Sequence, residues 1–131
     1  MPLPESLAEL PCLSGAVHGW MRMTPRCRLR LGVVVLDDLR ALRRFWRRAF
    51  RASIDDGYIG VVRDLSYAPD PDPLYFALMA LARSEITTAV VVHESVHAAQ
   101  IYAARVGNRS AYARCCGGMA EELVAYPAGV I

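Results

Sequence analysis

The chain contains no lysine, although it carries fifteen arginines, and only three of its 131 residues are histidines. It also lacks any apolar run near the roughly 18 residues that a membrane-spanning helix needs. No basic segment precedes the first apolar residues, so the start of the chain does not resemble a signal peptide. We therefore expect no membrane association and a protein that stays in the cytoplasm where it is made.

The four cysteines are few and lack the Cys-x-x-Cys spacing of many metal and redox sites. Two of them, Cys115 and Cys116, are adjacent and cannot easily form an ordinary disulfide with each other. This usage agrees with a reducing compartment, in which free cysteines behave as small buried or half-buried residues.

Length and composition predict a single globular domain over residues 1–131. Hydrophobic residues make up 54% of the chain and charged residues 21%, which excludes a disordered protein. A chain of this length suits one core. Residues 1–25 are rich in proline and glycine, so we expect an irregular N-terminal segment there.

The most informative stretch is His93-Glu-Ser-Val-His97, which has the His-Glu-x-x-His pattern of a zinc hydrolase helix. Residues four apart lie on one face of a helix, so both imidazoles can bind one Zn²⁺. Glu94 then lies beside the metal and can take a proton from a zinc-bound water, whose pKa the metal lowers. A shuffled chain of this composition contains the pattern with a probability of roughly 0.3%.

The neighbouring sequence predicts a helix over about 85–106 that carries this motif. Ser84 is a candidate N-cap, and Gly107-Asn108 is a stop signal. Apolar residues recur with helical spacing in line with the histidines, at Ile86, Val90, Ile101 and Ala104. The alternative is a buried helix whose two histidines satisfy backbone carbonyls.

A catalytic zinc takes a third protein ligand, and the only carboxylates downstream are Glu121 and Glu122. Gly117-Gly118 precedes them and Pro127 follows, which predicts a short helix over about 119–126. The residues alone do not choose between the two glutamates, and an exposed acidic turn is an alternative role for both.

Together, His93-Glu94-x-x-His97 and the later Glu122-Leu-Val-Ala-Tyr126 resemble the gluzincin class of zinc metallopeptidases. More narrowly, they resemble small phage- and prophage-encoded proteins with a His-Glu-(Ala/Ser)-Val-His helix. The resemblance covers about residues 58–127 and implies Zn²⁺ as cofactor, Glu122 as third ligand and Glu94 as general base. It implies a peptide or protein substrate, and host cytoplasm if the protein is phage-encoded. Tyr126 stands where larger gluzincins have an acid that orients a ligating histidine.

The rest of the chain predicts an α+β scaffold. Strands are expected over 27–36 and 58–67, and a helix capped by Asp37 or Asp38 should run to about Arg51. Residues 74–82 fit strand or helix, and we prefer a strand whose edge could pair with a substrate chain beside the metal. We therefore expect a small zincin-like domain, in which a few-stranded antiparallel sheet packs on the His-Glu-x-x-His helix and a short C-terminal helix follows.

Two other functions remain open. One is a non-catalytic zinc-binding module, whose site a fourth protein ligand would close. The other is a basic adaptor that uses the arginine-rich helix 38–51, although a solvated face is the simpler explanation of its charge. The alternative is an anionic partner, such as nucleic acid bound through phosphate contacts, but the net charge of only +2 does not favour a dedicated nucleic-acid-binding protein. The arginines on this helix are Arg40, Arg43, Arg44, Arg47, Arg48 and Arg51.

Four further residues could take part in metal chemistry. Tyr102 and Tyr112 could reach the open zinc position and stabilise an oxyanion, but packing is the commoner role of a tyrosine. Cys12 could block the zinc as in latent zymogens, since thiolate is a good zinc ligand. His18, near Trp20, is expected to be a surface or packing residue.

Overall fold

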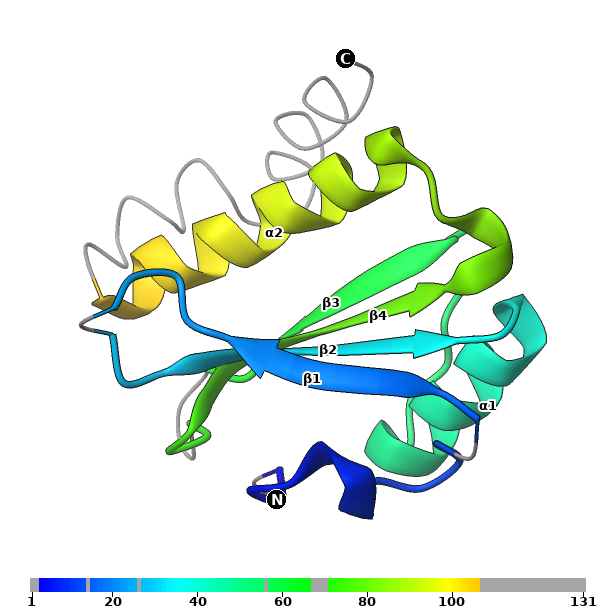
Figure 1. Ribbon diagram of the computed structural model, residues 1–131, viewed down its shortest axis with the longest axis horizontal. Coiled ribbons are helices and arrows are strands. Elements are labelled where there is room, and N and C mark those ends of the chain that lie inside the picture. Colours follow the sequence, from blue (N-terminus) through cyan, green and yellow to red (C-terminus); the bar gives the residue numbers. More distant parts are fainter. Residues whose placement is uncertain (1–2, 14, 26, 56, 67–70, 107–131) are drawn as a thin grey trace.

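The computed structural model describes residues 3–13, 15–25, 27–55, 57–66 and 71–106, which form an α+β fold. Four strands make one sheet and two helices pack on it (Figure 1). The strands are β1 (Val17–Met21), β2 (Arg30–Leu36), β3 (Gly60–Asp64) and β4 (Tyr75–Ala82). The helices are α1 (Leu39–Phe50) and α2 (Thr88–Val106), with short 3₁₀ turns η1 (Leu7–Glu9) and η2 (Arg83–Glu85).

The sheet has the order β1-β2-β4-β3 and is mixed. β1 pairs antiparallel with β2, and β3 pairs antiparallel with β4, but β2 and β4 run parallel. The expectation of an antiparallel sheet was therefore wrong for the central pair. The reason is the long connection between β2 and β4, which contains both α1 and β3 and returns the chain in the same direction.

β4 is one of the two central strands, and all eight of its residues are buried. Its sequence is a continuous apolar run, as is usual for a strand covered on both faces. The strand predicted over 74–82 is therefore confirmed, but its position differs from the one expected. Both edges of β4 are paired, with β2 and β3, so neither edge is open to a substrate chain.

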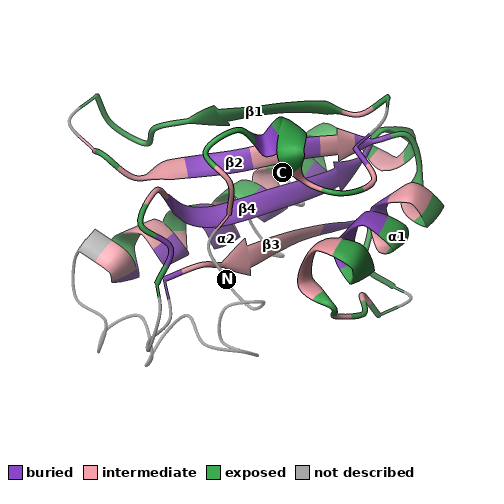
Figure 2. Ribbon diagram, turned by 90° about the horizontal axis from the view of Figure 1, so that it is seen from below, coloured by how far each residue is buried: buried purple, intermediate pink, exposed green. Residues whose placement is uncertain are grey.

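The helices α1 and α2 lie on opposite faces of the sheet (Figure 1). Side chains from the strands form one core layer beneath each helix. On one face, Val34 and Leu78 pack with Leu42, Phe45 and Trp46 of α1. On the other face, the buried members beneath α2 are Leu31, Phe76, Ala77, Met79, Leu81, Val90, Ala98 and Ile101. Figure 2 shows the resulting gradient, from the buried β4 to the exposed β1 at the sheet edge.

The helix predicted from about residue 38 to 51 is confirmed as α1. Asp38 is its N-cap, and the carboxylate accepts a hydrogen bond of 2.8 Å from the Ala41 amide. Arg51 ends the helix in the left-handed conformation, with φ of 51°. Its amide donates to the Arg47 carbonyl, which satisfies one of the last carbonyls of the helix.

Four boundary predictions need correction. The strand expected over 27–36 begins only at Arg30, as β2. Residues 1–25 are not wholly irregular, because they contain η1 and the edge strand β1. The motif helix starts at Thr88 rather than near 85, because Ile86 is extended, with ψ of 120°, and separates η2 from α2. β3 covers only residues 60–64 of the predicted 58–67. The predicted C-terminal helix over 119–126 lies outside the described residues.

Neither α1 nor α2 combines the length and the apolar character that crossing a membrane requires, and the described part of the chain contains no other α-helix.

Candidate metal centre

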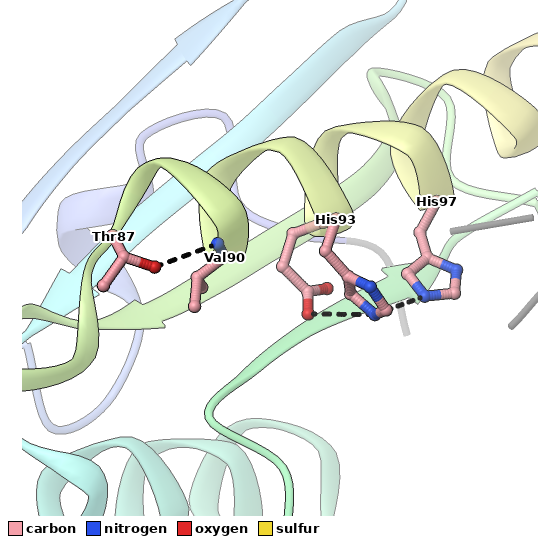
Figure 3. A network of polar contacts seen from close by, with 5 residues as sticks. Thr87, Val90, His93 and His97 are labelled. Atoms are coloured by element: carbon pink, nitrogen blue, oxygen red, sulfur yellow. Dashed lines mark hydrogen bonds and ion pairs between the residues drawn. The ribbon is translucent and has the colours of Figure 1, made fainter. Parts of the chain in front are cut away.

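The candidate site is built on α2, whose first turn is fixed by Thr87. The Thr87 hydroxyl accepts a hydrogen bond of 3.2 Å from the Val90 amide, as an N-cap residue does (Figure 3). Val90, Ala98 and Ile101 bury the inner side of the helix against the sheet. This packing offsets the weak helix propensity of the valines at the start of α2 and fixes the direction in which the motif side chains point.

His93 and His97 lie one turn apart, and their imidazoles converge. The two Nε2 atoms are 3.2 Å apart, and the ring centroids are 4.9 Å apart with planes at 75°. His97 is 9% exposed, and the His93 side chain is 13% exposed. The predicted placement of both histidines on one helix face is therefore confirmed (Figure 3).

The distance between the two nitrogens fits a shared tetrahedral metal. Two Zn–N bonds of about 2.0–2.1 Å at a tetrahedral angle place the nitrogens about 3.3–3.4 Å apart. The 3.2 Å separation is close to this value. The same separation also fits a hydrogen bond in which one neutral imidazole donates its Nε2–H to the other. Metal content, rather than the distance itself, distinguishes these two states.

The Glu94 carboxylate lies beside the pair, with Oε1 3.9 Å from His93 Nε2. Glu94 is only 5% exposed, which is unusual for a glutamate. Burying a carboxylate costs free energy unless a hydrogen bond or a positive charge compensates it. It lies between α2 and the start of β3, where a Cβ on Gly60 would be 3.2 Å from Glu94 Cγ. The absence of a side chain at Gly60 therefore gives the carboxylate its space.

Gly60 was not singled out from the sequence. The available signal was an isolated glycine in a β-branched segment, between Ile59 and Val61, which is typical of a close approach by another part of the chain. The partner of that approach, Glu94, is 34 positions away and could not be read from the local pattern.

β3 is an edge strand beside α2, and its outer edge has no partner strand in the described part of the chain. It forms one end of the sheet order, and among the described residues it pairs only with β4. Its first residue, Gly60, packs against Glu94 of the motif. Among the described strands, β3 rather than residues 74–82 therefore has an unpaired edge beside the motif helix.

No third candidate ligand joins His93 and His97 among the described residues. The described residues between 3 and 106 contain no group of three or more His, Cys, Asp or Glu side chains that could hold a metal ion together. Both candidates, Glu121 and Glu122, lie outside the described residues, as does Tyr112.

Of the other described candidates, Cys12 and Tyr102 pack against the two core layers and His18 is exposed. Cys12 packs against the core layer on the α1 side of the sheet, which argues against a role in blocking the metal. Tyr102 packs its ring against Phe76, with centroids 5.4 Å apart, which supports the packing role. His18 belongs to the exposed edge strand β1, at the other end of the sheet order from β3.

No protein-family model, curated protein or solved structure matches this chain. The resemblance to gluzincins therefore depends on the motif residues, and the geometry of His93, Glu94 and His97 has to be judged on its own.

Proposed function

We propose that this protein is a zinc-dependent metallopeptidase with a zincin-like domain. The supporting observation is the convergence of His93 Nε2 and His97 Nε2 to 3.2 Å, beside a buried carboxylate. In this proposal His93, His97 and Glu122 bind Zn²⁺, and Glu94 is the general base. Bound there, Zn²⁺ would act as a Lewis acid that activates water and polarises the scissile carbonyl.

Glu94 has the position that a general base needs. Its Oε1 is near the metal-binding nitrogens without lying between them, so the carboxylate can accept a proton from the attacking water. Its burial against Gly60 limits the number of conformations open to the carboxylate. A base held in this way loses little conformational entropy when the substrate binds.

The open edge of β3 supplies a binding mode for an extended peptide. Backbone groups on an unpaired strand edge can hydrogen-bond a chain of any sequence. Because β3 begins at the residue that touches Glu94, a peptide paired along this edge would pass the motif side chains. We therefore propose that the substrate binds as an added strand beside β3.

Metal analysis and a cleavage assay test the proposal together. The full chain should copurify with zinc and cleave an unstructured protein such as casein. Glu94→Gln should keep the zinc and lose cleavage, while His97→Ala should lose both. Glu85→Gln, which changes a glutamate in η2 just before the helix, is the matched control and should keep both.

Two results would contradict the proposal. If the wild-type protein binds no zinc, the histidines form a hydrogen-bonded pair instead of a metal site. If zinc is bound but neither the wild-type protein nor any metal-loaded sample cleaves protein, the site is a closed, non-catalytic zinc module.

A further inference from the structure

The exposed face of α1 is entirely basic. Six arginines occupy the side of the helix opposite Leu42, Phe45 and Trp46, which are buried against the sheet. No acidic residue lies between positions 39 and 51, so this segment has a local charge of +6 although the whole chain has +2. Five of these arginines are exposed, namely Arg40, Arg44, Arg47, Arg48 and Arg51.

These five arginines have no carboxylate partner in the described part of the chain. The nearest acidic residue in the sequence, Asp38, uses its carboxylate to cap the helix at Ala41. Arginines three and four positions apart on a helix repel each other, which destabilises the helix. An external anion bound beside these five exposed arginines would reduce this repulsion.

We propose that the arginine face of α1 binds the phosphate backbone of double-stranded nucleic acid. From Arg40 to Arg51 the helix rises about 16 Å, at 1.5 Å per residue. A duplex carries one phosphate charge per about 1.7 Å of its axis when both strands are counted, so this length spans roughly nine phosphates, and those on the near side can meet the arginines. The guanidinium group also suits phosphate, because its planar donors can form two parallel hydrogen bonds to the oxygens.

An acidic protein surface is a poorer match for this face. The core of a stable protein interface is depleted of charge, and its buried anchors are aromatic residues as well as arginines. The exposed large hydrophobic residues of the described chain all lie outside α1. Binding by the α1 face would therefore be almost purely electrostatic, as in sequence-independent contacts to phosphates.

An anionic membrane surface is a poorer match for a different reason. Amphipathic helices bind membranes by inserting their apolar face among the lipids. The apolar face of α1 is already buried in the core, with Leu42 1%, Phe45 0% and Trp46 4% exposed. Exposing it to lipid would break the packing between α1 and the sheet.

This binding surface is separate from the candidate metal centre. α1 covers one face of the sheet, and α2 with its histidines covers the other (Figure 1). Substitutions on α1 can therefore be tested without touching His93, Glu94 or His97, and the outcome does not depend on whether the protein is a peptidase.

A salt titration with matched variants tests the proposal. Binding of the full chain to a labelled 20-base-pair DNA duplex would be followed by fluorescence anisotropy from low salt upwards. The affinity should fall steeply with salt. In Arg44→Gln/Arg48→Gln, the slope of log affinity against log salt should become shallower by about 1.8, because each lost phosphate contact removes about 0.9. The control Arg28→Gln/Arg83→Gln removes the same charge from exposed positions outside α1 and should keep the wild-type slope.

Three results would overturn the proposal. They are the absence of duplex binding at low salt, an equal change of slope in both double variants, and binding to poly-glutamate or to phosphatidylserine vesicles at least as tight as to the duplex. All four substituted arginines are exposed, so both variants should fold; circular dichroism of each variant checks this.

Discussion

Gly60 and Glu94 form a close contact between the edge strand β3 and the motif helix α2. A Cβ at position 60 would lie 3.2 Å from Glu94 Cγ, 3.4 Å from its Cδ and 3.1 Å from Leu81 Cδ2. The distances of 3.1 Å and 3.2 Å are shorter than ordinary contacts between carbon atoms. The approach of the helix to the strand, and with it the position of the Glu94 carboxylate, depends on the missing side chain.

Gly60→Ala should therefore move Glu94. Replacing a glycine stabilises by about 0.4–1 kcal/mol through the unfolded chain, but overpacking costs about 1–3 kcal/mol. We expect a net loss of about 1 kcal/mol in the free energy of unfolding, measured by denaturant titration. If Glu94 is the general base, cleavage should fall while zinc content stays unchanged.

Gly19→Ala is the matched control for this contact. Gly19 lies in β1, and an added Cβ there would meet no atom within 4 Å. Its stability should equal or slightly exceed that of the wild type. If both alanine variants have the same free energy of unfolding, the close contact between Gly60 and Glu94 does not affect stability, and the prediction is wrong.

Thr87 should contribute to stability through its hydroxyl. Thr87→Ala removes the acceptor for the Val90 amide and should lower the free energy of unfolding by about 1 kcal/mol. Thr88→Ala is the control, because Thr88 is the exposed first residue of the helix, where alanine has the better propensity. Thermal melts of the two variants compare them directly, and an equal decrease in both would argue against Thr87 as the cap.

The parts of the fold that depend on local signals were predictable from the sequence. Asp38 and the apolar period of residues 39–50 define α1 almost to the residue. The spacing of His93 and His97 also predicts their convergence, because a helix brings residues four apart together wherever it lies.

The parts that depend on distant contacts were not predictable. The parallel pairing of β2 with β4 joins segments about 45 residues apart, and no local pattern specifies it. β1 was missed because all five of its residues are exposed, so it lacks the apolar alternation of a half-buried strand and is held by pairing with β2. The same limit applies to the site, where Gly60 matters only through Glu94.

Asp72 is expected to be the polar residue most important for the loop between β3 and β4. It is 4% exposed, and its Oδ1 accepts hydrogen bonds of 2.9 Å and 2.8 Å from the Leu74 and Tyr75 amides. Its Oδ2 accepts one of 2.6 Å from the Leu3 amide. Asp72→Ala would leave these donors without partners and should cost about 3 kcal/mol, since each buried unsatisfied donor costs about 1–3 kcal/mol.

Asp72→Asn should cost less than the alanine variant, because its amide oxygen can still accept from the two amides bound by Oδ1. Asp55→Ala, at an exposed position, should leave stability unchanged. Denaturant titration of the three variants gives the order. An asparagine variant as unstable as the alanine variant would mean that the bonds to Leu74 and Tyr75 contribute little.

Glu122 is expected to be the third zinc ligand, and Glu121 is its matched control. The two residues are adjacent and chemically identical, so glutamine at either position changes charge and volume by the same amount. Loss of a group that merely orients a ligand already costs roughly 10–100-fold in metal affinity. Loss of a direct ligand in Glu122→Gln should therefore lower zinc affinity at least 100-fold, measured by competition with a chelating dye, while Glu121→Gln should bind zinc as the wild type does. The opposite order would transfer the role to Glu121, and equal affinities in all three proteins would mean that neither glutamate binds the metal held by His93 and His97.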